Sequence, residues 1–448
     1  MSPTDSSAPH ARASAAHFLS VTDQDVHTRD YISFLNDSPT SFHAAQLSAQ
    51  RLIDAGFSQH NETDPWDASP GGHLIIRDGA VVAWFVPHRV SDDTHFRIVG
   101  AHTDSPCLTV KPSPTSRTVD GWEHINVEIY GGMLWNSWLD RELCVAGRVI
   151  TTDGRCLIMR TGPLARIPQL AIHLDRAVNN DGLKLNPQKH MHPVWNVGSP
   201  AQLMDIVARD AGLEGAHMIA AYDLRLLPSQ AAATFGADNV FVAAGRQDNL
   251  SSVHAGLRAL ERISASGIPD SGDILVFACF DHEEIGSATR SGAAGPILRD
   301  VLSRTALAVG HDFDGAARMY AASTCISADA GHSVHPNYPE HHDPAHHPIL
   351  GGGPMLKVNA QQRYATDGVG TALWNRACAQ AGISSQVFVS NNAMPCGSTI
   401  GSITATQLGI TTVDVGVPLL SMHSAREMSH VADLYALSLA LEAYWAGA

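Results

Sequence analysis

The chain has 448 residues, of which 44% are hydrophobic and 16% are charged, and its formal net charge is −15. This length exceeds one ordinary hydrophobic core, so two or three domains are expected. The negative charge argues against nucleic acid and anionic membranes as partners, because both select basic surfaces. An acidic substrate stays open, because a cationic pocket can lie within an acidic protein.

Cysteine usage and the N-terminal segment indicate a compartment. The seven cysteines are scattered and show no CxxC spacing, which is typical of reduced thiols. Near its start the chain carries no apolar segment long enough for a signal peptide, and no run is long enough to span a membrane. We therefore predict a cytoplasmic protein in which residues 1–22 form a disordered tail.

The segment that follows combines helix and hairpin signals. Ser38 and Pro39 are typical of an N-cap and a first helical position, and the apolar stripe behind them ends near Gly56. Residues 74–86 predict a β-hairpin that turns at an Asp-Gly pair. Residues 96–101 predict a short buried strand.

The sequence pattern changes at residue 107. Short β-like runs and loops rich in glycine and proline indicate that residues 107–241 form an inserted, mostly β domain. The remaining ranges, 23–106 and 242–448, would form a discontinuous catalytic domain. We predict an α/β fold in which helices sandwich a mixed sheet.

The second half of the chain alternates helical and strand patterns. An apolar stripe over residues 250–263 and the terminal stripe over 430–445 predict helices. The predicted strands lie at residues 273–280, 306–309, 386–390 and 412–417. The segment 335–348 is rich in histidine and proline and predicts a solvated loop.

Glu283 and Glu284 directly follow the predicted strand at 273–280. A solvated turn is the commoner fate of such a pair. A buried pair of carboxylates needs a cation or a metal ion, because an unpaired buried charge costs several kcal/mol. The rest of the sequence decides between these two interpretations.

Other acidic and imidazole side chains also stand at the ends of apolar runs. In open α/β sheets such positions can converge although they are distant in sequence. Two imidazoles and three carboxylates are a suitable donor set for two zinc ions that share a carboxylate. Each residue alone has an ordinary structural interpretation, since Asp248, for example, could be a plain N-cap. The residues beside apolar runs are His102, Asp104, Asp248, Asp329 and His423, and the third carboxylate of the donor set would come from the Glu283-Glu284 pair, with one Glu to spare.

Several segments occur in an order that resembles a known family. They lie at residues 101–108, 246–250, 281–287, 327–338, 357–366 and 421–428. Together they resemble the aspartyl aminopeptidase family of di-zinc exopeptidases, over a range from about residue 30 to the C-terminus.

The resemblance implies a metal centre. His102, Asp248 and Asp329 would hold one zinc ion, and Asp248, Glu284 and His423 would hold the other, so that Asp248 bridges the two. It also implies that Glu283 is the general base and that Asp104 orients the imidazole of His102.

The resemblance further implies substrate contacts and an assembly. His173, in the inserted domain, would reach the site of a neighbouring subunit, and the inserted domain would serve dimerisation within a dodecamer. The implied substrate-binding residues are His173, Glu283, Asp329, His332, Lys357 and Tyr364.

The predicted function is removal of an N-terminal Asp or Glu from peptides with a free N-terminus. Two zinc ions per subunit are expected, with cobalt or manganese as possible substitutes. Lys357 is the candidate cation for an acidic substrate side chain. The alternatives are an aminopeptidase of broad or neutral specificity, a di-zinc amidohydrolase for N-acyl amino acids, and a scaffold with an inactive site.

Overall fold

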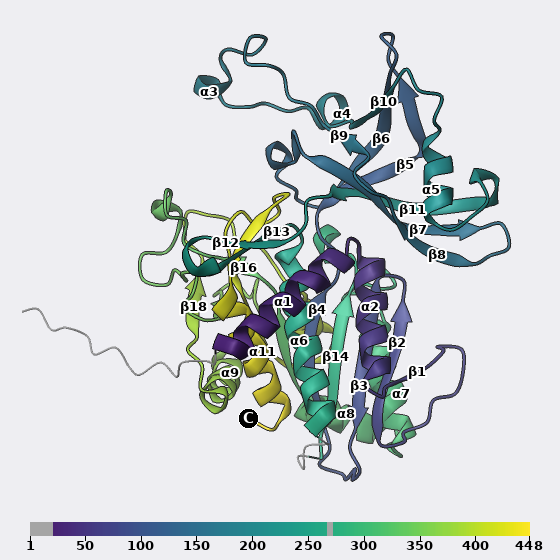
Figure 1. The fold of residues 1–448 in the computed structure, drawn as a ribbon. Coiled ribbons are helices and arrows are strands. Elements are labelled where there is room, and N and C mark those ends of the chain that lie inside the picture. Colours follow the sequence, from purple (N-terminus) through teal and green to yellow (C-terminus); the bar gives the residue numbers. More distant parts are fainter. Residues whose placement is uncertain (1–20, 267–271) are drawn as a thin grey trace, which may run out of the picture.

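A computed structural model describes residues 21–266 and 272–448. Residues 1–20 of the predicted tail over 1–22 lie outside the described residues, and residues 21 and 22 already belong to helix α1, which begins at Val21. The described chain has two parts, a large α/β layered unit and a mostly β unit that stands on one end of it (Figure 1). Among these residues we find no helix that is both long and apolar enough to cross a membrane.

The α/β unit is built on a nine-stranded sheet in the order β1-β2-β3-β14-β4-β15-β19-β17-β18. Its four central strands, β14, β4, β15 and β19, are parallel, whereas β3 and β17 pair antiparallel with their neighbours in this central block. The strands are β1 (Ser58–Gln59), β2 (Gly71–Arg77), β3 (Ala80–Val86), β4 (Phe96–His102), β14 (Ile274–Phe280), β15 (Thr324–Ala328), β17 (Met355–Val358), β18 (Gln386–Val389) and β19 (Thr411–Gly416). The predicted mixed sheet is confirmed.

Helices cover both faces of this sheet. One face packs against α1 (Val21–Asp37), α2 (Ser41–Asp54), α6 (Gln247–Ser266), α9 (Gly368–Ala381) and α11 (Val431–Trp445). The other face packs against α7 (Ile297–Ala308), α8 (Phe313–Ala322) and α10 (Ile400–Leu408). The predicted sandwich of helices around the sheet is therefore confirmed.

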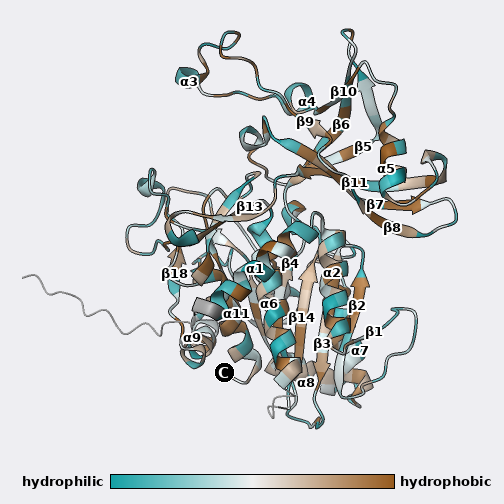
Figure 2. Cartoon of the chain, in the orientation of Figure 1, coloured by the Kyte–Doolittle hydropathy of each residue, from teal (hydrophilic) through white to brown (hydrophobic). Residues whose placement is uncertain are grey.

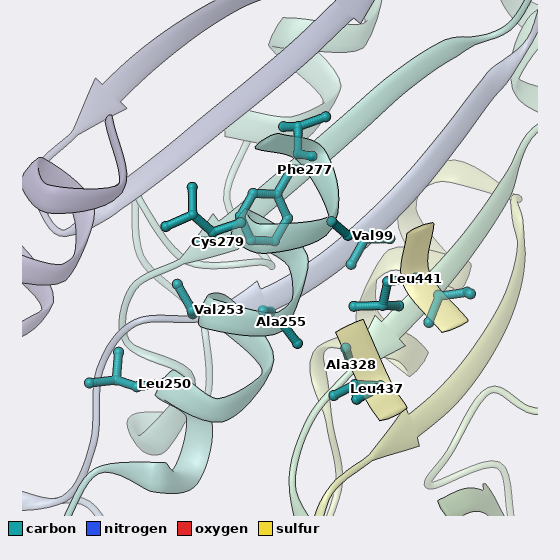
Figure 3. Packing of buried hydrophobic residues seen from close by; sticks show 14 of the residues in the cluster. Val99, Leu250, Val253, Ala255, Phe277, Cys279, Ala328, Leu437 and Leu441 are labelled. Carbon is teal, nitrogen blue, oxygen red and sulfur yellow. The ribbon is translucent and has the colours of Figure 1, made fainter. Parts of the chain in front are cut away.

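Strand alternation supplies both hydrophobic cores. On β14, Phe277 and Cys279 face the first core, whereas Val276 and Ala278 face the second. Figure 3 shows side chains from β4, β14, β15, α6 and α11 meeting in the first core. Each large apolar side chain buried here contributes about 1.5–3 kcal/mol to the free energy of folding.

Helix α6 lies unusually close to the sheet. A Cβ atom on Gly256 would stand 2.4 Å from the ring of Phe277, so a side chain at this position would force the helix and the strand apart. Because Asp248 lies in the first turn of α6, this contact also helps to fix the position of that carboxylate.

The element predictions meet two corrections. The hairpin at residues 74–86 forms as β2 and β3, but residues 306–308 belong to helix α7 rather than to a strand. Ala306 continues the helical apolar face that Val301 and Leu302 present to the second core, and a run of four apolar residues alone cannot reveal that period. Helix α2 begins at Ser41 with Thr40 as its N-cap, two residues beyond the predicted cap.

The second unit is a β-barrel with its own core. Strand β11 pairs with both β5 and β7, which closes the ring β11-β5-β6-β10-β9-β7, and β8 pairs with β7 outside this ring. Brown, hydrophobic strands of this unit are visible above the main sheet in Figure 2. The strands are β5 (Cys107–Arg117), β6 (Trp122–Tyr130), β7 (Glu142–Thr151), β8 (Cys156–Arg160), β9 (Ala165–Arg166), β10 (Val194–Val197) and β11 (Ile219–Pro228).

Short elements complete both units. All barrel strands fall within the segment 107–241 that was predicted as an insertion, and its role in dimerisation stays a prediction. The short helices here are α3 (Val178–Asp181), α4 (Pro187–His190) and α5 (Leu203–Asp210). The short strands that lie near the site are β12 (Ala233–Phe235), β13 (Phe241–Ala244), β16 (Gly331–His332), β20 (Pro418–Leu419) and β21 (Glu427–His430).

Candidate metal centre

Three neighbouring parallel strands bring predicted site residues to one edge of the main sheet. His102 is the last residue of β4, Glu283 and Glu284 lie in a 3₁₀ turn just beyond β14, and Asp329 directly follows β15. Because β14, β4 and β15 are adjacent and parallel, their carboxyl ends meet at the same edge.

Two further segments complete the group. Asp248 comes from the start of α6, and His423 comes from the loop between β20 and β21. His102, Asp248 and Glu284 each offer a ligand atom, and these atoms lie within 4.8 Å of one another. The structure therefore gathers side chains that lie up to 321 positions apart in the sequence, from His102 to His423.

Asp248 lies at the middle of the group. Its Oδ1 is 3.2 Å from Nε2 of His102, and its Oδ2 is 3.2 Å from Nε2 of His423. Asp329 Oδ1 stands 3.4 Å from the same nitrogen of His102, and Glu284 Oε1 stands 3.3 Å from that of His423. Two clusters thus share one carboxylate, as a metal pair with a bridging Asp would require.

Nδ1 of each imidazole is hydrogen-bonded to a backbone carbonyl. Nδ1 of His102 donates to the backbone carbonyl of Asp104 at 3.1 Å, and Nδ1 of His423 donates to that of Gly132 at 3.1 Å. A carbonyl oxygen can only accept, so each ring must carry a proton on Nδ1. Nε2 of both rings is thereby turned toward the carboxylates, which is the arrangement found around metal-ligating histidines.

The donor set fits a cation. Asp248 Oδ1 and Glu284 Oε1 are buried, and neither accepts a hydrogen bond of good geometry from the described residues. Burial and the neighbouring carboxylates raise the pKa of Glu283 to about 8 and the pKa of Glu284 to about 7. Four acidic groups crowded around two imidazoles oppose one another's ionisation, and bound cations would relieve that repulsion.

Neighbouring carboxylates raise the pKa values of both imidazoles. Burial alone would lower the pKa of His423, but Asp248 and Glu284 raise it to about 12. The pKa of His102 is likewise raised well above its usual value by Asp104, Asp248 and Asp329, against the effect of burial. Without bound cations both rings would therefore hold a proton near pH 7.

Asp104 makes contacts that the sequence did not reveal. Its Oδ1 lies 3.5 Å from Nδ1 of His102, and its role in orienting that ring stays a prediction. The same carboxylate also accepts the backbone N–H of Glu283 at 3.0 Å and that of Glu284 at 3.1 Å. Asp104 therefore fixes the turn that carries both glutamates.

The barrel unit contributes to the centre through the end of β6. The hydroxyl of Tyr130 donates to Oδ2 of Asp104 at 2.7 Å. Gly131 follows with φ +71°, and a Cβ atom there would lie 3.1 Å from Cβ of Glu284. Neither contact was predicted, although the Tyr-Gly-Gly sequence at a strand end is a signal for a tight backbone turn.

The predicted substrate-binding residues Lys357, Tyr364 and His332 differ in their burial and in their distance from the metal group. Lys357 is buried, and its Nζ donates to the carbonyl of Ala330 at 2.7 Å and lies 3.6 Å from Oδ2 of Asp329. Nζ also stands 5.4 Å from the ring centre of Tyr364, so these two residues adjoin the metal group. His332, on β16, has an exposed side chain.

His173 is not brought to this centre within one chain. It lies in an exposed turn that leads toward α3, and α3 stands far from the main sheet in Figure 1. Its predicted contact with the site of another subunit stays a prediction.

A second group of possible ligands lies near the outer edge of the main sheet. His60, Asp67 and His73 offer ligand atoms within 4.8 Å of one another. However, Nε2 of His60 and Nδ1 of His73 are hydrogen-bonded at 2.7 Å, and Nε2 of His73 donates to the carbonyl of Ser69 at 2.8 Å. Both rings also stack on Trp84, so packing and hydrogen bonds account for this group without an ion.

The fold and the clustered donors define a metallohydrolase-like α/β protein, and comparison with known proteins gives the family. Residues 34–445 match the family model of the aminopeptidase I zinc metalloproteases (M18). The chain therefore belongs to the M18 family of zinc aminopeptidases.

Individual relatives agree over nearly the whole chain. A probable M18 family aminopeptidase 2 of Streptomyces coelicolor is 51% identical over 422 residues, which cover 93% of this chain and 97% of the relative. A solved dodecamer of mApe1 from Saccharomyces cerevisiae is 26% identical, with a TM-score of 0.83 over 95% of this chain and 98% of that chain. An M18 aminopeptidase from Thermotoga maritima shares the fold at 23% identity, with a TM-score of 0.85 over 98% of this chain and 99% of that chain.

Proposed function

We propose that this zinc aminopeptidase holds two zinc ions per subunit and removes N-terminal Asp or Glu from peptides. The observation that carries the di-zinc proposal is the position of Asp248, whose two oxygens each face a different imidazole nitrogen at 3.2 Å. His102 and Asp329 would complete one site, and Glu284 and His423 would complete the other. Cobalt or manganese could occupy similar ligands.

Glu283 is the proposed general base. Its Oε2 lies 3.9 Å from Nε2 of His102, farther than the carboxylate oxygens of Asp248 and Asp329. Burial raises its pKa to about 8, which suits a group that takes and returns a proton near neutral pH. Zinc bound beside it would lower the pKa of water and polarise the scissile carbonyl. Glu283 would accept the proton of the water and deliver it to the leaving amine.

Lys357 is the proposed partner of an acidic substrate side chain. It is buried, and its ammonium lies 3.6 Å from Oδ2 of Asp329. Tyr364 lies next to it, and Phe388 contacts the rings of both Tyr364 and His332. These contacts support Lys357 as the cation that one acidic side chain of the substrate would meet.

Assembly into a homo-oligomer, built from dimers, is part of the proposal. The S. cerevisiae relative is a dodecamer. The segment before α3 exposes Leu170, Ile172 and Leu174 around His173, and three exposed apolar side chains in one segment favour burial against another subunit. His173 could then reach a neighbouring site and stabilise negative charge on the substrate. We further propose a cytoplasmic location.

A panel of substrates tests the proposal. The protein, stripped of metal and reloaded with zinc, is assayed on the p-nitroanilides of Asp, Glu and Leu and on N-acetyl-aspartate. We expect Asp and Glu to be preferred and the blocked amino acid to be inert. Preference for Leu would indicate broad specificity, and hydrolysis of N-acetyl-aspartate would indicate an amidohydrolase.

The base is tested separately with Glu283→Gln. Replacing the carboxylate removes the proton acceptor, so kcat should fall by at least about 100-fold, within the range that general-base catalysis contributes. Zinc content, measured by inductively coupled plasma mass spectrometry, should stay at two ions per subunit. Full activity with two zinc ions bound would remove Glu283 from the catalytic role.

A further inference from the structure

Glu427 is a buried carboxylate outside the predicted ligand set. It is the first residue of β21 and only 1% exposed. Its Oε1 accepts the backbone N–H of His423 at 2.8 Å. Its Oε2 accepts the backbone N–H of Gln247 at 2.6 Å and that of Asp248 at 3.2 Å.

These three contacts join two segments of the chain. One segment enters α6 and carries Asp248, and the other is the loop between β20 and β21 that carries His423. The main chain holds the ends of both segments near Glu427, because Glu427 is paired with Ala244 of β13 and Leu420 exchanges backbone hydrogen bonds with Met428. Between those ends, the side chain of Glu427 accepts hydrogen bonds from the backbone of both segments, the one that carries Asp248 and the one that carries His423.

Only a carboxylate satisfies this arrangement. Both oxygens face backbone N–H donors, so both must accept, and hydrogen bonds to a charged acceptor are the stronger kind. Glutamine has nearly the same shape, but its NH₂ group would oppose an N–H donor in either orientation. The orientation that loses the fewest hydrogen bonds keeps the amide oxygen on the N–H groups of Gln247 and Asp248. It places the NH₂ group against the N–H group of His423.

We propose that Glu427 is a positioning residue that sets the separation of Asp248 and His423 and thereby the zinc affinity of the site that contains His423. This inference rests on the proposed di-zinc site. Both oxygens of Glu427 accept backbone N–H groups, so it would act through Asp248 and His423 and not on the substrate itself.

The chain offers a matched control. Asp433 is also fully buried, and its two oxygens accept the backbone N–H groups of Gly351 and Gly353, both at 2.7 Å. It holds a loop that contains none of the predicted ligands. Asp433→Asn therefore removes a similar buried carboxylate and should reproduce any general loss of stability, but not a change in zinc affinity.

The test is a zinc titration of metal-free protein against a chromophoric chelator, with thermal unfolding measured in parallel. In Glu427→Gln we expect one zinc ion to bind about 10- to 100-fold more weakly, in the range typical of changes to groups that hold metal ligands. The other should change by less than about threefold, and Asp433→Asn should bind both normally. In a His423→Ala background, Glu427→Gln should leave the affinity of the remaining zinc ion unchanged.

Three results would overturn the inference: normal binding of both ions by Glu427→Gln, an equal loss in Asp433→Asn, or a further loss in the His423→Ala background. If Glu427→Gln does not fold, hydrogen exchange of the wild-type protein decides. The amides of Gln247, Asp248 and His423 should then be protected in the metal-free protein as well as in the zinc-loaded protein, and rapid exchange without zinc would refute the inference. Binding of fewer than two zinc ions by the wild type would instead refute the di-zinc proposal.

Discussion

The hydroxyl of Tyr130 is the barrel unit's side-chain contact with Asp104, and Tyr130→Phe removes it. The tyrosine is 8% exposed, and its hydroxyl donates to Oδ2 of Asp104 at 2.7 Å. The substitution keeps the ring, including its contact with the guanidinium of Arg225 at 4.8 Å. A buried hydrogen bond to a charged acceptor contributes about 1.5–3 kcal/mol, so the free energy of unfolding should fall by about that amount.

A part of this loss should appear in catalysis. Asp104 also holds the backbone of Glu283 and Glu284, so a loosened Asp104 lets both glutamates move. If about 1.4 kcal/mol of the lost energy had served to position Glu283 in the transition state, kcat would fall about tenfold. The assay is kcat and KM at saturating zinc, together with denaturant unfolding.

Tyr222→Phe is the control for this prediction. Tyr222 lies in the same barrel, and its hydroxyl donates to the carbonyl of Lys111 at 2.7 Å, with no predicted site residue involved. Tyr222→Phe should lower the free energy of unfolding by about 0.5–1.5 kcal/mol and leave kcat unchanged. A Tyr130→Phe protein with kcat within twofold of the wild type, or a Tyr222→Phe protein with an equal loss of kcat, would show that Asp104 needs no support from the barrel.

Two further predictions concern the charges of the site. Lys357→Met removes the buried cation and should raise KM for Asp-p-nitroanilide at least about tenfold, the equivalent of 1.4 kcal/mol, while sparing Leu-p-nitroanilide; an unchanged ratio of kcat/KM would exclude Lys357 from the pocket. Zinc binding should release at least two protons at pH 7, because the raised pKa values of His102 and His423 keep both rings protonated in the metal-free protein and a ligating imidazole must be neutral. The raised pKa of the Glu284 carboxyl adds a further fraction of a proton. Zinc affinity should therefore weaken as the pH falls. Isothermal titration calorimetry in buffers of different ionisation enthalpy measures this release, and fewer than one proton would contradict the assignment.

The features that sequence predicted well are those with a local cause. The hairpin of β2 and β3 follows from its Asp-Gly turn and from apolar runs on both sides. The strand β14 was visible because seven consecutive buried residues leave few other choices. Where the local cause was ambiguous, as for residues 306–309, tertiary packing decided and the predicted strand became the end of helix α7.

The candidate ligands were predictable for a different reason. Each is an acidic or imidazole side chain just beyond an apolar run, and the parallel pairing of β14, β4 and β15 turns that shared sequence position into a shared place. Asp248 and His423 come from outside the main sheet, so strand order alone could not locate them. Their position beside apolar runs still marked these two as candidates, and the family resemblance then implied the ligand roles of the whole set.

The groups that hold the ligands could not be predicted. Tyr130 and Glu427 act on backbone N–H groups or on another carboxylate, and such contacts leave no periodicity and no motif spacing in the sequence. Tyr130 also crosses from the barrel to the α/β unit, and Asp104 lies 26 positions before it in the sequence. Such contacts depend on how the two units meet, which no local pattern encodes.

The adjacent glutamates illustrate how much of a residue's role the backbone decides. Glu283 and Glu284 have the same side chain and lie in the same short turn, whose two N–H groups are held by Asp104. Because successive residues of such a turn project in different directions, Glu284 reaches within 3.3 Å of His423 whereas Glu283 stays 3.9 Å from His102. The closer carboxylate is suited to hold a metal ion, and the more distant one remains free to move a proton. The proposed division of labour between ligand and base therefore arises from the turn and from the carboxylate beneath it rather than from any difference between the two residues.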